Sequence, residues 1–124
     1  MREIIDKSLQ LEDITIFMKI FKLYKSYLAL LSDQKELGIG DVTLSSPPTI
    51  AGMKSTSSSF KLFGIHNNLT SSIIAKRLST LLKAPVLVLL FLKSEIHEEE
   101  IIRPIIDFVN KHLEQIKKSH QSEE

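Results

Sequence analysis

The segment GIHNNLTSSIIAKRL, residues 64 to 78, has some residue types of a phosphate-binding loop, with a glycine and polar side chains before a helical pattern. A Walker loop needs several glycines and a lysine followed by Ser or Thr, so that backbone N–H groups and an ammonium converge on the phosphates. Here Gly64 stands alone and no lysine lies at the helix start. Asn67, Asn68 or Thr70 can instead cap the helix through a side-chain oxygen. We therefore interpret the segment as a helix start without a ligand.

The other residues that could do chemistry are scattered along the chain. Histidines at positions 66, 97, 112 and 120 lack the spacing of a zinc site, and we expect each on the surface. Glu98, Glu99 and Glu100 are consecutive, so on a helix they point in different directions and favour its N-terminus. The chain has no cysteine and no serine in a G-x-S-x-G pattern. The sequence therefore predicts no catalytic residue, cofactor or metal site, and we expect a protein that is not an enzyme.

Composition excludes several classes of partner. Sixteen basic and fifteen acidic side chains give a formal charge of +1, without the basic excess that nucleic-acid binding needs. The longest apolar run, Val86–Leu92, is far shorter than the roughly 20 residues of a membrane-spanning helix. The first residues carry charges where a signal peptide has an apolar run. We expect neither nucleic acid nor membrane as a partner, and a cytoplasmic location with the nucleus as a second compartment.

Alternation of apolar and polar residues predicts strands in most of the first half of the chain. In ITIFMKIFKLYK, residues 14 to 25, both parities are largely apolar. A helix could align Ile14, Phe17, Met18 and Phe21, but the β-branched start and the lack of a terminating glycine favour a strand. One parity holds Ile14, Ile16, Met18 and Ile20, and the other holds Thr15, Phe17, Lys19, Phe21 and Leu23. The predicted strands are residues 3–13, 14–25, 27–33, 37–46, 59–64 and 86–92.

Turn and breaker residues connect these strands. Asp33–Glu36 supply a polar turn that would make residues 27–33 and 37–46 neighbours in a meander. Gly38 and Gly40 are expected to weaken or bulge the second of these strands. Pro47 and Pro48 end it, because proline cannot donate to the ladder. The small polar residues that follow predict a flexible loop at about 46–58.

Helical periodicity predicts two helices in the second half. The first helix ends before Ala84-Pro85, and Ser79 is expected among its solvent-facing residues. The second helix begins between Glu98 and Arg103, because Pro104 must lie in its first turn or cause a kink. Between them, VLVLLFL predicts a central strand covered on both faces. The buried stripes are Ile74, Leu78, Leu81 and Leu82, then Ile102, Ile105, Ile106, Val109, Leu113 and Ile116. We expect one domain over residues 1–119 and a solvated tail over residues 120–124.

These elements predict an α+β fold, with a six-stranded, mainly antiparallel sheet and two helices on one face. Two helices about 10 Å across cannot cover both faces of a sheet whose strands lie about 4.8 Å apart. Both parities of residues 14–25 are nevertheless apolar, and exposed apolar patches mark interfaces. We expect the Ile16 parity against the helices and Phe17, Lys19 and Phe21 at a dimer interface on the other face.

The second half of the chain also resembles a known family. The stretch TSSIIAKRLSTLLKAPVLVLLFL has a Thr-Ser helix start, Ala75, the pair Arg77-Leu78, a basic helix end and an immediate strand. With the terminal helix IIRPIIDFVNKHLEQIKK, it resembles the proteasome assembly chaperones, most closely the fourth type. The resemblance covers about Phe60–Leu113, and the Ser-rich stretch Ser45–Ser59 and Pro104 depart from it.

The resemblance implies an antiparallel sheet that pairs, face to face, with a homologous chaperone of the third type. Such heterodimers hold an α-type subunit of the 20S core particle and guide α-ring assembly. Contacts with that subunit would come from the Ser-rich loop or the basic helix face, at Met53, Lys54, Ser55, Lys76 and Lys83. The alternative is a small adaptor of the roadblock or longin-like kind, which dimerises by extending a sheet edge or pairing helices.

Overall fold

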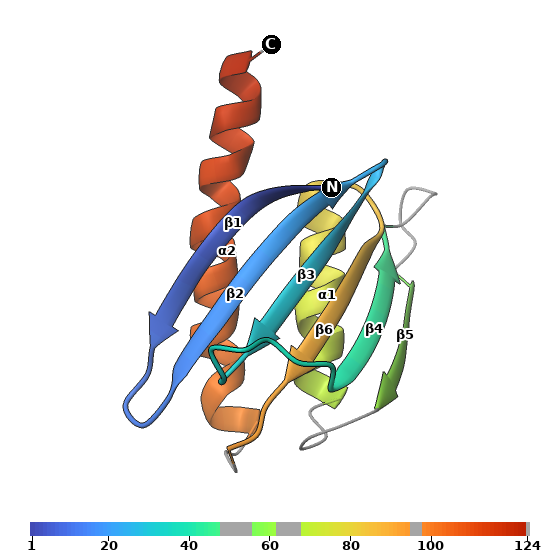
Figure 1. Ribbon diagram of the computed structural model, residues 1–124. Helices are drawn as coiled ribbons and strands as arrows, with labels where there is room; N and C mark the ends of the chain where they lie inside the picture. Colours follow the sequence, from blue (N-terminus) through green and yellow to red (C-terminus); the bar gives the residue numbers. More distant parts are fainter. Residues whose placement is uncertain (48–55, 62–67, 95–97, 124) are drawn as a thin grey trace.

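The computed structural model describes residues 1–47, 56–61, 68–94 and 98–123. Strands fill the first half of the chain, and a helix precedes and follows the last strand (Figure 1). The elements are β1 (Arg2–Gln10), β2 (Thr15–Leu23), β3 (Ser26–Ser32), β4 (Asp41–Ser46), β5 (Thr56–Lys61), α1 (Asn68–Leu82), β6 (Val86–Phe91) and α2 (Glu98–Glu123). No helix of these described ranges is long and apolar enough to cross a membrane.

The strands form one mixed sheet in the order β1-β2-β3-β6-β4-β5. β6 pairs in parallel with β3 and antiparallel with β4, and the remaining neighbours are antiparallel. The predicted α+β class with two helices is confirmed, and β6 is central as expected. The predicted meander from β3 to β4 is wrong, because β6 lies between these strands. The connection between them therefore crosses the sheet instead of making a tight turn.

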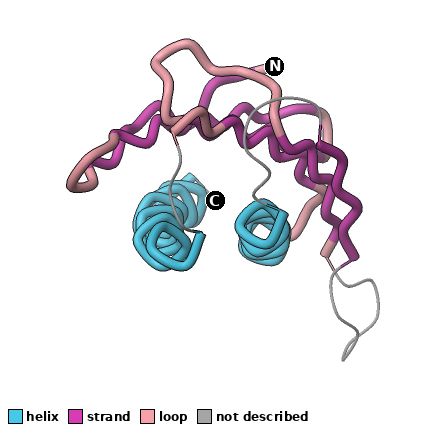
Figure 2. Tube along the Cα trace, turned by 90° about the horizontal axis from the view of Figure 1, so that it is seen from below, coloured by secondary structure: helices cyan, strands magenta, loops and turns pink. Residues whose placement is uncertain are grey.

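Both helices lie on the same side of the sheet, and the core fills the space between them and the strands (Figure 2). Ile16, Met18 and Ile20 are fully buried in this core, which confirms the parity expected against the helices. Along α2 the buried stripe includes Ile101 and Phe108, whereas the predicted Ile102 is only half-buried. The adjacent isoleucine pairs at 101–102 and 105–106 make two helix faces equally apolar, so periodicity alone does not choose between them.

Helix α1 packs on β4 through small polar side chains as well as through Ile74 and Leu78. Ser79, predicted to face solvent, is fully buried, and its hydroxyl lies 3.1 Å from that of Ser45. The hydroxyls of Thr43 and Ser71 form a second buried pair. Because β4 presents hydroxyls to the helix, a serine on α1 can be buried with a hydrogen-bond partner.

Several predicted boundaries differ from the structure: β1 ends at Gln10 instead of residue 13, β4 begins at Asp41 instead of residue 37, and β5 begins at Thr56 instead of residue 59. β4 extends to Ser46, and Thr56 already pairs with it, so the connection is shorter than the predicted loop at 46–58. Within that connection, residues 48–55 lie outside the described residues. α2 begins at Glu98, within the predicted range, and continues to Glu123, through most of the predicted tail 120–124. The sequence after residue 116 contains no glycine or proline that would end a helix.

Candidate functional site

The sheet face turned away from the helices is the candidate functional site, called here the open face. Residues directly opposite each other on neighbouring strands share a face, and here they form two rows that are apolar except for Lys19. The first row is Phe21, Leu28, Leu87 and Leu44, and the second is Lys19, Leu30, Leu89 and Val42. The open face thus draws its side chains from β2, β3, β6 and β4.

Exposure distinguishes the two parities of the central strands. On β6 the helix-facing side chains Val86, Val88 and Leu90 are essentially inaccessible, while Leu87 and Leu89 are only half-buried. At the β4 end of the first row, Leu44 is 52% exposed. A contiguous apolar surface that remains accessible to solvent is typical of a protein interface.

Charged residues of β1 and β2 border this apolar surface. The Lys19 ammonium lies 3.9 Å from a carboxylate oxygen of Glu3 and 3.9 Å from one of Asp6. Such exposed pairs at the edge of the contact range contribute little stability, because water screens them. The open face therefore has an apolar centre and a polar margin along its β1 edge, as protein interfaces do.

The connection between β3 and β4, residues 33–40, lies over one end of the open face and is called here the strap (Figures 1 and 2). We expected no other part of the chain to cover this face, and the strap shows that this expectation was wrong for one end of it. Gly38 lies so close to the Phe91 ring that an added Cβ would be 3.0 Å from two ring carbons. Glycine there permits the close approach, and neither Gly38 nor Gly40 belongs to β4.

Asp33 anchors the start of the strap to the end of β6. Its carboxylate accepts hydrogen bonds from the backbone N–H groups of Lys93, at 2.9 Å, and Ser94, at 2.7 Å. Burial alone would raise the pKa of Asp33, but these hydrogen bonds, together with one from Gln34, outweigh it and lower the pKa below its ordinary value. The ionised carboxylate therefore stabilises this junction of two distant segments.

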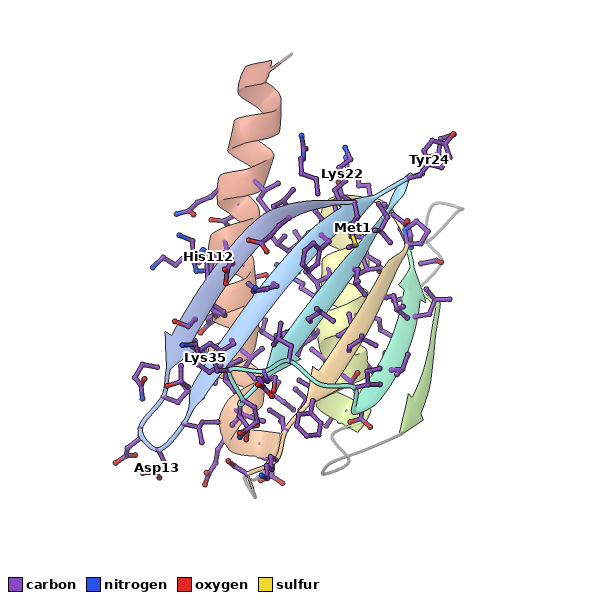
Figure 3. The ribbon with its side chains drawn as sticks, viewed as in Figure 1. Met1, Asp13, Lys22, Tyr24, Lys35 and His112 are labelled. Atoms are coloured by element: carbon purple, nitrogen blue, oxygen red, sulfur yellow. The ribbon has the colours of Figure 1, made fainter. Side chains whose placement is uncertain are left out.

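A hollow of about 360 Å³ lies where the strap meets β1 and β2. Lys35, labelled in Figure 3, and Leu37 come from the strap, and the other lining residues are Asp6, Lys7, Ser8, Phe17 and Lys19. The lining contains no histidine or cysteine, and nowhere in the described ranges do three His, Cys, Asp or Glu side chains gather as metal ligands. The hollow has the residues to hold a side chain of a binding partner.

His112 on α2 lies apart from this site, on the helix side. It was expected on the surface, but it is half-buried, with its ring edge-on to Phe108 at a centroid distance of 4.6 Å. Burial lowers its pKa, Lys111 and Lys7 lower it further, and a hydrogen bond with Gln115 opposes them. The neutral imidazole therefore fits this position as a packing residue. The other three histidines lie at positions where the structure describes no side chain.

The structure separates the two groups of predicted interface residues. Phe17, Lys19 and Phe21 project from β2 onto the open face, together. Lys76 and Lys83 are exposed on and just after α1, in the other layer of the fold. The remaining predicted contacts, Met53, Lys54 and Ser55, lie outside the described residues.

Sequence reasoning missed most of the open face. β6 was expected to be covered on both faces, but the helices cover only one, so Leu87 and Leu89 belong to the open face with Leu28, Leu30, Val42 and Leu44. The available signal was that several strands are apolar on both parities while two helices can cover only one face. Which strands adjoin, and therefore which leucines gather, depends on pairings between distant segments.

Comparison with solved structures finds this fold in a chain of a complex described as a novel chaperone complex for yeast 20S proteasome assembly. The TM-score is 0.56, the sequence identity is 10%, and the match covers 88% of this chain and 95% of that one. No protein-family model matches the chain, and no curated protein does. The similarity is therefore one of fold.

Proposed function

We propose that this chain is a subunit of an assembly chaperone for the 20S proteasome, acting in the cytoplasm. It pairs through the open face with a homologous chaperone of the third type, and the pair binds an α-type subunit and promotes α-ring formation. The observation that carries the proposal is the accessible apolar face of the sheet, in a fold shared with a proteasome assembly chaperone complex.

The dimensions of the open face suit such a partner. The four strands that form the open face, about 4.8 Å apart and about 20 Å long, span roughly 400 Å² in projection. Stable protein complexes bury about 800 Å² on each partner, so a standard interface would use the whole open face together with the strap and the β1 margin. Burying a leucine or phenylalanine contributes about 1.5 to 3 kcal/mol, which makes the two apolar rows the main source of affinity.

The β1 edge of the sheet argues against sheet extension at that edge, which is one way in which the alternative adaptor would dimerise. β1 is an edge strand, and its register with β2 shifts between Glu3 and Ile5. Next to this irregularity it carries the charged residues Asp6 and Lys7. Bulges and charges on an edge strand disfavour pairing with another strand. We therefore place dimerisation on the open face rather than at this edge.

Two adjacent leucines of β6 give a matched test of pairing. Leu89 lies on the open face and Leu90 is buried against the helices. We expect Leu90→Ala to lower the free energy of unfolding by about 2 to 5 kcal/mol, and Leu89→Ala to leave folding nearly intact while weakening pairing. The measurements are urea unfolding of the chain and calorimetric titration of the chain with the separately purified third-type chaperone. Two results would refute the proposed interface. One is an unchanged affinity of the Leu89→Ala chain for the partner, and the other is a wild-type chain that is a stable monomer and does not bind the partner.

The aromatic residues of β2 extend this test. Phe17→Ala and Phe21→Ala are expected to weaken pairing more than they weaken folding, since both side chains lie on the open face. Affinity purification followed by mass spectrometry tests the wider proposal, and the third-type chaperone and α-type subunits should dominate the captured proteins. Capture of neither, in cells that contain both, would contradict the proposed function.

Contacts with the α-type subunit are tested separately from pairing. Met53→Ala with Lys54→Ala changes the predicted contact in the Ser-rich loop. Lys76→Ala with Lys83→Ala changes the predicted contact on the basic helix face. These substitutions leave β5 intact, unlike a deletion that reaches Thr56. We expect at least one pair to reduce α-subunit capture in a pull-down while sparing the heterodimer. Wild-type capture by both pairs would remove these residues from the proposed contact.

A further inference from the structure

One end of the sheet concentrates cationic side chains, of which Arg2, Lys25 and Lys83 are exposed and Lys22 is half-buried. The β2–β3 hairpin, residues 23–26, and the connection from α1 to β6, residues 83–85, meet there, because the backbone N–H of Tyr27 donates to the carbonyl of Pro85 at 3.0 Å. On the neighbouring strand, Arg2 lies opposite Lys22. We call this surface the cationic end, formed by Arg2, Lys22, Tyr24, Lys25 and Lys83.

Two lysines of the cationic end occupy backbone conformations that favour glycine. Lys25 has a φ of 52° and Lys83 a φ of 54°, and they are the non-glycine residues with positive φ in the described chain. Lys25 is the second residue of a two-residue hairpin turn, since Leu23 pairs with Ser26. Lys83 follows the last residue of α1, where the Ala84 N–H donates to the Ser79 carbonyl at 3.3 Å and closes the helix end.

Glycine or asparagine is the usual residue at both positions, because a Cβ is disfavoured in the left-handed region. Local folding preferences therefore do not account for lysine at either position. Residues held in disfavoured conformations cluster at sites of function, where the side chain matters more than the strain. Two such lysines at one end of one sheet point to a role for their charge.

An exposed aromatic side chain lies beside one of these lysines. Tyr24 is 86% exposed at the tip of the hairpin, and the Lys25 ammonium lies 5.4 Å from the centre of its ring. Figure 3 shows Tyr24 and Lys22 together at this end, with Asp13 at the opposite end of the sheet. Tyrosine is one of the residue types that dominate binding energy at protein interfaces.

Charge is segregated along the sheet although the whole chain is nearly neutral. Residues 22–27 and 83–86 contain no Asp or Glu, and Glu3, which follows Arg2, lies with its carboxylate 3.9 Å from the Lys19 ammonium. The β1–β2 hairpin at the other end contains Glu12 and Asp13. A cationic surface attracts an acidic partner and selects against a basic one. Nucleic acid would require a longer basic stripe than this narrow end and its few cations provide.

We propose that the cationic end binds an acidic segment of a partner protein. Carboxylates of that segment pair with Lys25 and Lys83, and an apolar group beside them packs on the Tyr24 ring. The surface is distinct from the open face and shares only Lys83 with the proposed α-subunit contact. The inference therefore goes beyond the proposed function, and its test uses no proteasome subunit.

A double substitution separates charge from structure at this surface. Lys25→Gly with Lys83→Gly removes both ammonium groups and supplies the residue that each backbone position favours. The matched control, Lys93→Gln with Lys111→Gln, removes two exposed lysines that lie outside the cationic end. The probe is a fluorescently labelled peptide of glutamates, titrated at low salt and followed by anisotropy, with melting temperature measured on the same samples.

We expect the glycine pair to weaken peptide binding at least about tenfold without lowering the melting temperature, and the control pair to change binding less than about twofold. Tyr24→Ala should weaken binding of a glutamate peptide that carries one phenylalanine more than it weakens binding of the glutamate peptide alone. Absence of peptide binding by the wild type, or equal losses for both pairs, would overturn the inference. It would also be overturned by a lower melting temperature of the glycine pair, or by tighter binding to duplex DNA or phosphatidylserine vesicles than to the peptide.

Discussion

Asp33→Asn tests whether the junction between the strap and β6 depends on an ionised carboxylate. The wild-type carboxylate accepts N–H groups of both Lys93 and Ser94. The amide of asparagine has one accepting oxygen and one donating nitrogen, so one of these N–H groups would lose its partner. An unsatisfied buried donor costs about 1 to 3 kcal/mol. We expect a loss of about 2 kcal/mol in unfolding free energy at neutral pH, or roughly 1 M in the urea midpoint.

The same contribution should depend on pH in a known direction. The pKa of Asp33 in the folded state is lower than its ordinary value of 3.8, so the folded state favours the ionised form. The contribution is therefore complete above 3.8 and is lost as the pH falls through the lowered folded-state value. Protonated aspartic acid and asparagine are nearly equivalent here, so the difference between wild type and Asp33→Asn should shrink as the pH falls below 3.8.

Urea unfolding at about pH 7, 5 and 3 measures this difference. Asp13→Asn is the matched control, because Asp13 is exposed in the β1–β2 hairpin, and its effect should stay within about 0.5 kcal/mol. Equal stability of wild type and Asp33→Asn at neutral pH would refute the proposed anchor. A difference that persists unchanged at acid pH would show that the charge of Asp33 is not its cause.

Three further substitutions test packing, each by urea unfolding. Gly38→Ala should cost about 1 to 3 kcal/mol of unfolding free energy, because the added Cβ would meet the Phe91 ring. Phe91→Leu in the same chain should recover part of that cost, and a double variant whose loss equals the sum of the two single losses would argue against the contact. Ser79→Ala should cost about 1 to 2 kcal/mol, because it leaves the buried Ser45 hydroxyl without its partner, and adding Ser45→Ala should not cost more. Ser45→Ala alone should cost less, because the Ser79 hydroxyl still donates to the Lys76 carbonyl, so equal effects of the two single changes would contradict this account. Leu78→Ala should cost about 2 to 5 kcal/mol, and a loss below 1 kcal/mol would place Leu78 outside the core.

Sequence patterns predicted the local elements of this fold because those elements depend on local chemistry. The alternation in β2 placed Ile16, Met18 and Ile20 against the helices, and Pro47 marks the end of β4. These outcomes follow from the two-residue period of a strand and from the missing N–H of proline. They do not require knowledge of which strands adjoin.

The pairing of distant segments was not predictable in the same way. The parallel register of Leu28 with Leu87 joins residues far apart in the chain, and the alternation of either strand is compatible with other neighbours. The strap was not predicted, for the same reason. Gly38 was expected to weaken or bulge a strand, because the sequence does not show that Gly38 lies against the Phe91 ring. The candidate site was therefore predicted only in its β2 part, Phe17, Lys19 and Phe21, and its interface role stays a prediction.

The insertion of β6 between β3 and β4 also has a kinetic consequence. β1, β2 and β3 pair with their sequence neighbours and can associate early, but the centre of the sheet closes only after β6 has joined β3. Contacts between distant segments slow folding, because the loop between them must close first. During synthesis, β1–β3 would leave the ribosome with both faces apolar before α1, β6 and α2 exist. We therefore expect the nascent chain to be prone to aggregation until its last helix has been made.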